Sequence, residues 1–193
     1  MSAASHRLEN KVAIVTGAAS GFGEGIARRF AEEGAKVVVA DLNAREAEPV
    51  ATEIGPNAIF TATDVTNRSQ IDAMVYATMQ AFGRIDVMVN NAGFTHRSGD
   101  LLEVEEETFD LIADVNMKAI YFSTLAVVPI MERQGGGSII TTASTSGIRP
   151  QAGLTWYNAS KGWAITATKS MALELAPKKI RVNCLCPVSG DTP

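Results

Sequence analysis

Short apolar runs, rich in β-branched residues, recur along the chain between longer segments of mixed polarity. Runs of this length that are apolar at successive positions are typical of strands buried on both faces of a parallel sheet. Six such strands are predicted: Lys11–Thr16, Lys36–Ala40, Ala58–Thr63, Ile85–Val89, Ser138–Thr142 and Ile180–Leu185.

The segments between these runs place apolar residues at helical spacing, and they predict helices of ordinary to long length. The helices expected are Glu24–Gly34, Ala44–Ile54, Ser69–Phe82, Glu105–Arg133 and Trp156–Ala176. Strict alternation of strand and helix predicts an α/β fold with a doubly wound parallel sheet and right-handed crossovers. We therefore expect one three-layer α/β/α domain of the Rossmann type over residues 1–193, with no linker and no internal repeat.

Composition excludes some classes of protein but does not indicate a function. The chain has 193 residues, of which 46% are hydrophobic and 20% charged, and its net charge is −4. A basic run that would favour nucleic acid is absent, and no uncharged apolar stretch reaches the roughly 18 residues of a membrane span. The polar N-terminus lacks the apolar core of a signal peptide, so we expect a cytoplasmic protein.

Metal binding is not expected. The chain has only two histidines, and its only cysteines are Cys184 and Cys186. A Cys-x-Cys pair without further ligands makes a poor metal site, and two thiols so close in sequence rarely form a disulfide. We expect both to be buried free thiols.

A glycine-rich turn follows the first strand directly and precedes the first helix. Gly17, Gly21 and Gly23 are spaced G-x-x-x-G-x-G within Thr16–Gly23, which differs from the common G-x-G-x-x-G fingerprint. Glycines let the backbone turn tightly and approach a pyrophosphate, while the helix N-terminus offers free N–H groups to the anion. The position of this turn predicts the first half of a dinucleotide-binding fold.

The acid at the end of the second strand predicts the choice of dinucleotide. Asp41 lies about where such folds place the carboxylate that binds the adenosine ribose. Its charge repels a 2′-phosphate by about 4 kcal/mol at 4 Å and an effective dielectric of 20. Ser20 and Leu42, its expected neighbours, are neutral. We therefore predict NAD(H) rather than NADP(H), unless Arg45 turns toward the ribose.

Two further strand ends carry polar residues at the edge where such folds bind their ligand. Asp64–Val65 follows the third strand and either flanks the adenine or simply ends a turn. Asn90-Asn91-Ala92-Gly93 follows the fourth strand, and its Asn and Gly residues tolerate unusual backbone angles. This stretch either lines the cofactor or has a structural role, and the two are compatible.

Tyr157 and Lys161 lie four residues apart on a predicted helix, so their side chains share one face. A lysine ammonium beside a phenol favours the phenolate, and a tyrosine of this kind is a good general acid or base for an alcohol or ketone. Taken alone, the spacing describes an ordinary surface pair. Its meaning depends on the rest of the chain.

These motifs together resemble the short-chain dehydrogenase/reductase family, including its 3-oxoacyl-acyl-carrier-protein reductases and NAD-dependent secondary-alcohol dehydrogenases. The resemblance covers nearly the whole chain, in order and at the expected spacing. It rests on Thr16-Gly17-x-x-x-Gly21-x-Gly23, Asp64-Val65, Asn90-Asn91-Ala92-Gly93, Asn116, Ser144, Tyr157-x-x-x-Lys161 and Ile180-Arg181-Val182-Asn183 before Pro187.

The resemblance implies a role for each member of a catalytic group. Tyr157 exchanges a proton with the substrate oxygen, and Lys161 favours the phenolate and binds the nicotinamide ribose. Ser144, 13 residues before Tyr157, hydrogen-bonds the substrate oxygen. Asn116 holds a water that links Lys161 to solvent, and this poor helix former predicts a local irregularity in its helix. Rival hydroxyls near Ser144 are Thr141, Thr142, Thr145 and Ser146.

The same resemblance implies the cofactor site. The predicted cofactor-binding residues are Gly17, Ser20, Gly21, Phe22, Gly23, Asp41, Leu42, Asp64, Val65, Asn91, Ala92, Gly93, Tyr157, Lys161 and Pro187.

Two features depart from the family pattern. Pro187 is followed by Val188 where the family usually has glycine, which puts the shape of this loop in doubt. Family members also continue past the position of Pro193 with a substrate-covering loop, helices and a last strand. We therefore expect a longer natural protein, in which the missing part completes the substrate site.

Little in the sequence identifies the substrate or the partner. Leu154 and Trp156 suggest an apolar wall of the substrate site, or plain packing. The helices at Glu105–Arg133 and Trp156–Ala176 resemble those that form a dimer interface in the family, which implies a homodimer or homotetramer. Their apolar residues suit an interface and a core equally: Ile120, Phe122, Leu125, Ile165 and Met171.

The predicted function is hydride transfer between NAD(H) and a small carbonyl compound or secondary alcohol. One alternative is an NADP(H)-dependent 3-oxoacyl-acyl-carrier-protein reductase. Another is a dinucleotide-binding protein without turnover, whose sequence would be expected to lack part of the catalytic group.

Overall fold

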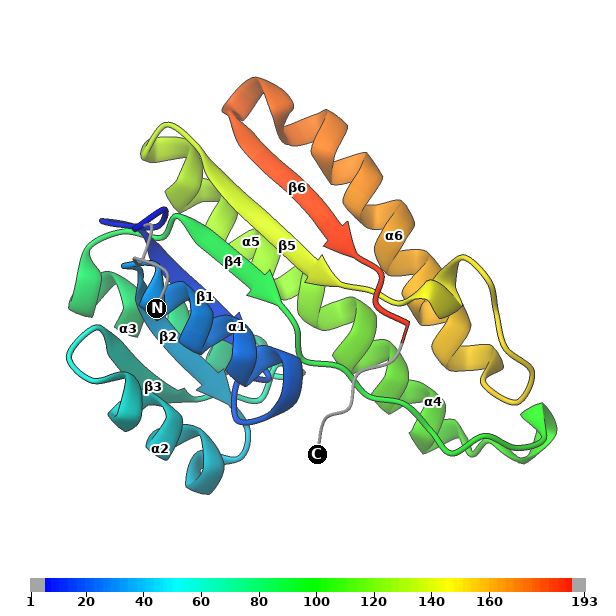
Figure 1. The fold of residues 1–193 in the computed structure, drawn as a ribbon. Helices are drawn as coiled ribbons and strands as arrows, with labels where there is room; N and C mark the ends of the chain where they lie inside the picture. Colours follow the sequence, from blue (N-terminus) through cyan, green and yellow to red (C-terminus); the bar gives the residue numbers. More distant parts are fainter. Residues whose placement is uncertain (1–5, 189–193) are drawn as a thin grey trace.

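The computed structural model describes residues 6–188, and it contains the six predicted strands in one parallel sheet (Figure 1). The sheet order is β3-β2-β1-β4-β5-β6. The strands are β1 Val12–Thr16, β2 Lys36–Asp41, β3 Ala58–Ala62, β4 Val87–Asn90, β5 Gly137–Thr142 and β6 Ile180–Leu185. The order reverses between β1 and β4, and this switch point is where doubly wound sheets bind ligands.

Helices cover both faces of the sheet, so the predicted three-layer fold is confirmed (Figure 1). Helices α1 and α2 pack on one face, and α3, α5 and α6 pack on the other. The bounds are α1 Gly21–Glu32, α2 Ala44–Ile54, α3 Arg68–Phe82, α4 Glu106–Ala113, α5 Ala119–Arg133 and α6 Thr155–Leu175.

Each buried strand contributes to two hydrophobic cores, as expected for a parallel sheet. In β1, Ala13 and Val15 face α1 and α2, whereas Ile14 between them faces the opposite core. Because successive side chains alternate between faces, an apolar residue is needed at every position of the strand. This explains the continuous apolar runs in the sequence.

The predicted long helix contains the irregularity expected around Asn116. Helices α4 and α5 are joined by one π-helical segment, Asp114–Lys118, and Asn116 is buried in it. A π segment fits one extra residue into a helical turn, and such segments are frequent at functional sites. Asn116 in this segment hydrogen-bonds the backbone of Phe94, which lies beyond the end of β4.

The continuous helical stretch from Glu106 to Arg133 is long and apolar enough to cross a membrane by length and composition alone. Its packing gives a different reason for the apolar character, since Val127 and Met131 are fully buried against the sheet. Its outer face exposes Tyr121 and Leu125. We interpret this stretch as a core helix with an apolar outer face.

Two element boundaries differ from the sequence expectation for identifiable reasons. Helix α1 begins at Gly21 rather than Glu24, because the last residues of the glycine turn already form its first turn. Strand β4 begins at Val87 rather than Ile85. The Gln134 side chain donates to the Ile85 carbonyl at 2.8 Å and accepts from the Ile85 N–H at 3.0 Å, which occupies both backbone groups.

Candidate active site

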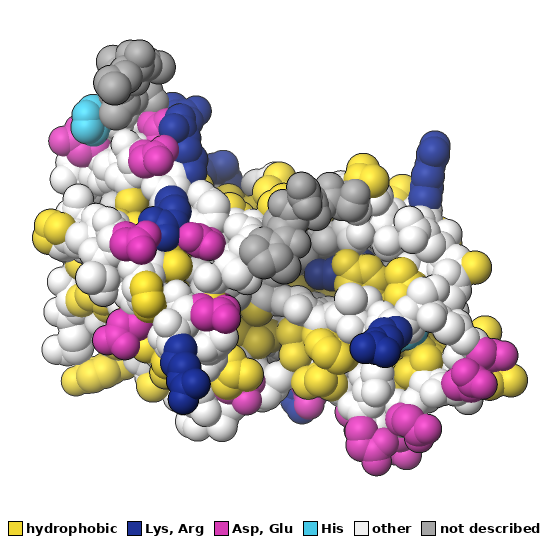
Figure 2. Space-filling view, turned by 60° about the horizontal axis from the view of Figure 1, so that its bottom comes forward, with side chains coloured by type: hydrophobic (Ala, Val, Ile, Leu, Met, Phe, Trp, Pro, Cys, Tyr) yellow, Lys and Arg dark blue, Asp and Glu magenta, His cyan; other side chains and the backbone are white. Residues whose placement is uncertain are grey.

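A cavity of about 860 Å³ lies at the carboxyl ends of the strands. Figure 2 shows hydrophobic side chains around the hollowed middle of this side of the molecule, with charged side chains mainly toward its two ends. Most of the predicted site residues line it together: Gly17, Ser20, Phe22, Asp41, Leu42, Asp64, Val65, Asn91, Ala92, Gly93, Ser144, Tyr157, Lys161 and Pro187. Gly21, Gly23 and Asn116 are not among the lining residues.

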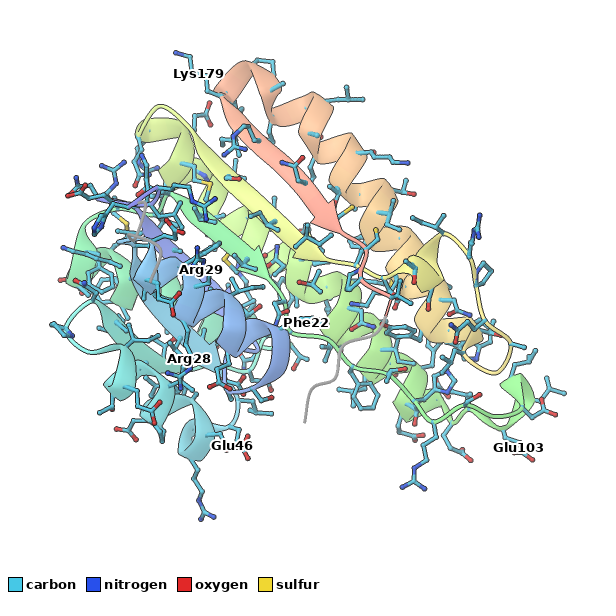
Figure 3. The ribbon with its side chains drawn as sticks, in the orientation of Figure 1. Phe22, Arg28, Arg29, Glu46, Glu103 and Lys179 are labelled. Carbon is cyan, nitrogen blue, oxygen red and sulfur yellow. The ribbon has the colours of Figure 1, made fainter. Side chains whose placement is uncertain are left out.

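The glycine turn forms one end of the cavity, and its shape depends on missing side chains. Gly17 has a φ of +62°, and a Cβ there would lie 2.8 Å from the Cα of Ala92. A Cβ at Gly23 would lie 1.9 Å from the carbonyl oxygen of Gly17. Gly23 therefore lets α1 pack tightly onto the turn, and it is not among the residues that line the cavity. Phe22 projects from the start of α1 toward the centre of the molecule (Figure 3).

Asp41 lies beside this turn and helps to hold it. One carboxylate oxygen accepts a hydrogen bond from the backbone N–H of Ala19 at 2.9 Å, and the other accepts from Asn43 at 2.8 Å. Each oxygen keeps a second lone pair that can accept from a ribose hydroxyl. Asp41 therefore holds the turn in place, and its carboxylate remains available to a ribose.

Asp64 has one of the two roles that the sequence left open, that of a turn residue. Its carboxylate accepts hydrogen bonds from the backbone N–H and the hydroxyl of Thr66, at 2.9 and 2.7 Å, which makes it a turn residue. Together with Val65 it also lines the cavity. The pair is therefore available to a ligand at this end of the sheet.

Asn91 joins β4 to the glycine turn. Its side-chain amide donates hydrogen bonds to the carbonyls of Thr16 and Gly17, each at 3.1 Å. The backbone N–H groups of Asn91 and Ala92 donate to the Thr16 hydroxyl. The Asn90–Gly93 stretch therefore shapes the floor of the cavity and also lines it.

Ser144 is distinguished from its rival hydroxyls by its partners. The Ser144 hydroxyl oxygen accepts from the Ser146 N–H at 3.1 Å, which leaves its own proton free to be donated into the cavity. The Thr145 hydroxyl donates to the Pro187 carbonyl, and Thr142 donates to Asn91. Thr141 and Ser146 are buried away from the cavity lining.

Tyr157 and Lys161 face the opposite end of the cavity from the glycine turn. The Lys161 Nζ lies 5.6 Å from the centre of the Tyr157 ring and donates to the Thr142 carbonyl at 2.9 Å. Only 5% of Lys161 is exposed, and burial lowers the pKa of Lys161 to about 8. The pair is not an exposed surface pair.

Asn116 braces this end from behind. Its amide oxygen accepts from the Phe94 N–H at 2.8 Å, and its amide nitrogen donates to the Phe94 carbonyl and to Ser160. Ser160 in turn donates to the Tyr157 carbonyl at 2.7 Å. A Cβ at Gly93 would lie 3.4 Å from Lys161 Nζ and 3.6 Å from the Asn116 oxygen, so both groups face residue 93.

Some cavity residues were missed from the sequence, because no local motif marks them. Leu111 lies on α4 and Val115 lies in the π segment. Both line the cavity because this helical stretch lies near the carboxyl ends of the strands (Figure 1). The other lining residues outside the predicted site adjoin predicted ones: Thr63, Thr66, Thr142, Ala143 and Val188. Trp156 packs edge-to-face on Phe109 at 5.4 Å, and neither Trp156 nor Leu154 lines the cavity.

The cysteines are free, as predicted, but they are half-buried rather than buried. Cys184 lies on β6, which is an edge strand of the described sheet, and Cys186 follows it. Burial raises the pKa of the Cys186 thiol, and the neighbouring Cys184 raises it further. The edge position of β6 explains why the thiols keep some exposure.

Comparison with known proteins identifies the family. The family model described as short chain dehydrogenase matches residues 11–193. The chain belongs to the short-chain dehydrogenase family. It is 46% identical over 189 residues to 4-formylbenzenesulfonate dehydrogenase of Comamonas testosteroni, which covers 96% of this chain and 75% of that protein. It is 42% identical over 194 residues to the 3-oxoacyl-[acyl-carrier-protein] reductase of Thermotoga maritima, covering 97% and 77%.

A solved structure supports both the fold and the kind of cofactor. The 3-ketoacyl-(acyl-carrier-protein) reductase of Brucella melitensis, in complex with NADH, superposes with a TM-score of 0.95 at 47% identity. The match covers 96% of this short-chain dehydrogenase and 78% of the Brucella chain. The protein is therefore an oxidoreductase that transfers hydride with a nicotinamide dinucleotide and acts on CH–OH groups. The glycine turn, which lines one end of the cavity at Gly17 and leads into the start of α1 at Gly21, fits such a cofactor.

Proposed function

We propose that this short-chain dehydrogenase uses NAD(H) to interconvert a small carbonyl compound and its secondary alcohol, with Tyr157 as the general acid and base. One observation carries the proposal. Ser144, Tyr157 and Lys161 share a single cavity with Asp41, which lies at its far end beside the glycine turn.

Each side chain at the catalytic end either donates or accepts a proton or holds a neighbouring group in position. Ser144 donates its free proton to the substrate oxygen and stabilises charge that develops there. Tyr157 gives its phenolic proton to that oxygen during reduction and takes it back during oxidation. A bound nicotinamide supplies or accepts the hydride at the carbonyl carbon. Lys161 provides a buried ammonium beside the phenol, and Asn116 and Ser160 fix the backbone around Tyr157.

Charge at the adenosine end supports NAD(H) over NADP(H). The Asp41 carboxylate lines the cavity and already accepts two backbone hydrogen bonds, so its charge is held in place. A 2′-phosphate placed 4 Å from it would be repelled by about 4 kcal/mol at an effective dielectric of 20. Measuring kcat/KM with NADH and with NADPH tests this choice, and a preference for NADPH contradicts it.

A 3-oxoacyl-acyl-carrier-protein reductase is the second candidate, because relatives bearing that name are 42% and 47% identical to this chain. The Brucella relative was solved with NADH, so this activity is compatible with our cofactor proposal. A panel of 3-oxoacyl thioesters, ketones and secondary alcohols, followed by NADH absorbance, separates the candidates.

The same proposal includes a cytoplasmic homodimer or homotetramer that assembles through α5 and α6. The exposed apolar side chains of Tyr121, Leu125 and Trp163 on these helices support it. Light scattering on the purified protein measures the mass directly. A monomer across the micromolar range contradicts the assembly.

Replacement of Tyr157 tests the mechanism. Tyr157→Phe keeps the ring but removes the proton donor, so we expect kcat to fall about 100-fold or more while NADH affinity stays within about twofold. Tyr76→Phe on α3 is the matched control, because Tyr76 is exposed and lies outside the cavity lining. Turnover like that of the wild type in Tyr157→Phe would refute the mechanism.

A further inference from the structure

Thr142, the last residue of β5, uses its two polar groups in two directions. Its hydroxyl donates to the side-chain oxygen of Asn91 at 3.1 Å. Its backbone carbonyl accepts from Lys161 Nζ at 2.9 Å. The residue is half-buried and lines the cavity between the glycine turn and the catalytic end. Thr142 therefore touches both ends of the site.

The Asn91 side chain needs this hydroxyl. Its nitrogen donates to the Thr16 and Gly17 carbonyls, which fixes the orientation of the amide and leaves the oxygen as an acceptor. The Thr142 hydroxyl supplies the donor. Because a Cβ at Gly23 would lie 2.5 Å from the same Asn91 nitrogen, α1 packs directly against this amide. The position of Asn91 thus sets the geometry of the glycine turn.

Lys161 depends on the same residue from the other side. A buried ammonium requires a hydrogen-bond acceptor, and burial already lowers the pKa of Lys161 to about 8. The Thr142 carbonyl provides that acceptor at the end of the strand. The Ala143 N–H holds the same peptide to the Leu185 carbonyl of β6 at 2.8 Å. The bond from Thr142 to Asn91 holds it from the β4 side, so loss of that bond leaves the peptide and the Lys161 head held from β6 alone.

We propose that Thr142 is a positioning residue that couples the cofactor end of the site to Lys161. Its hydroxyl holds Asn91 and the glycine turn, and its carbonyl holds the lysine head. The effect of this coupling on turnover rests on the proposed function. The hydrogen bonds also predict changes in the cofactor-free protein and in cofactor affinity, which do not require turnover.

A pair of substitutions separates coupling from a strand-forming role. Thr142→Val keeps the shape and the β-branch but removes the hydroxyl, whereas Thr142→Ser keeps the hydroxyl and removes the branch. If Thr142 only stabilised the β-strand, Val would be the better replacement. If it couples the two ends, Ser is the better replacement, because the Asn91 oxygen stays paired.

The measurements are NADH affinity by fluorescence titration, the pH dependence of kcat/KM, and the pH dependence of Lys161 acetylation followed by mass spectrometry. For Thr142→Val we expect NADH affinity to fall roughly tenfold, the usual scale for one half-buried acceptor left unpaired. We also expect the titration of Lys161 to shift in the cofactor-free protein. Thr142→Ser should keep both within about twofold of the wild type.

The coupling is supported if the two variants rank in opposite orders. Thr142→Val should be at least as stable as Thr142→Ser in urea unfolding, whereas Thr142→Ser should have the higher NADH affinity and the Lys161 titration closer to that of the wild type. Equal loss in both variants, or wild-type affinity and titration in Thr142→Val, would overturn the proposal. If the wild type turns over no carbonyl compound, the proposed function fails, yet affinity and acetylation still test Thr142.

Discussion

The two ends of the cavity are built on opposite principles. The cofactor end depends on the absence of side chains. There is no room for a Cβ at Gly17, which lies against Ala92, or at Gly23, where α1 meets the turn. The catalytic end depends on side chains that are present, and Ser144, Tyr157 and Lys161 each bring a polar group into the cavity.

This difference decides what kind of change damages each end. At the glycine turn, the addition of one methyl group should be as harmful as the loss of a catalytic group. At the catalytic end, removal of a few atoms should leave the fold intact and change only protonation or turnover. The charged groups of the two ends also differ in their surroundings. The Asp41 carboxylate is held by backbone N–H groups, whereas the Lys161 side chain is buried.

The largest expected effect comes from Gly23→Ala. The added Cβ would lie 1.9 Å from the Gly17 carbonyl oxygen and 2.5 Å from the Asn91 amide nitrogen, so α1 must move away from the turn. Overpacking against backbone at this distance predicts an NADH affinity about 100-fold lower or worse, with a loss of stability. Fluorescence titration with NADH and urea unfolding measure the two effects.

Gly25→Ala is the matched control two residues later in α1, where a Cβ would meet nothing within 4 Å. It should keep NADH affinity, and it should gain up to about 1 kcal/mol in stability because alanine favours a helix. If the two variants bind NADH alike, close packing at Gly23 does not shape the cofactor end.

Lys161→Met is expected to have the next largest effect, on the pH dependence of stability. The pKa of Lys161 is about 8 in the folded protein and 10.5 in an unperturbed lysine, because burial disfavours the ammonium. Between these values the unfolded chain binds more protons than the folded one, so this lysine makes stability rise with pH. The rise amounts to about 3 kcal/mol for a shift of this size.

Urea unfolding of the cofactor-free protein between pH 7.5 and 10 measures that rise. Lys161→Met should remove it, while Lys169→Met, an exposed position on the same helix, should retain it. An equal rise in wild type and Lys161→Met would mean that the buried lysine does not carry the pH dependence.

The smallest of these effects concerns the choice of cofactor. Asp41→Asn keeps an acceptor beside Ala19 but removes the charge, so the ratio of kcat/KM for NADPH to that for NADH should rise about tenfold or more. Glu46→Gln removes a charge from the first turn of α2 (Figure 3), at an exposed position outside the cavity lining, and should leave the ratio unchanged. A rise of the same size in both variants would point to net charge rather than to Asp41.

Features that follow from local pattern were predictable from the sequence. The apolar runs gave the strands, and the motifs led to Gly17, Asp41, Ser144, Tyr157 and Lys161, which the structure brings into one cavity. The irregular helix around Asn116 was also expected, since asparagine fits poorly into a regular helix.

The features that sequence reasoning missed depend on contacts between distant segments. The bond from Thr142 to Asn91 joins the end of β5 to the residue that follows β4, and no local spacing marks it. Leu111 reaches the cavity only because α4 passes beneath the carboxyl ends of the strands. Gly23 was assigned to the cofactor by its motif, whereas its close packing is visible only in three dimensions.

The π segment at Asp114–Lys118 has a consequence for comparing relatives of this protein. Each residue of a regular helix rotates the following side chains by about 100°. Because the π segment absorbs its extra residue within one turn, a homologue with one residue fewer here would keep the same faces of α5 toward the sheet, but the side chains within the segment would change direction. Segment length, rather than identity at position 116 alone, is therefore the feature to check before transferring the role of Asn116 by alignment.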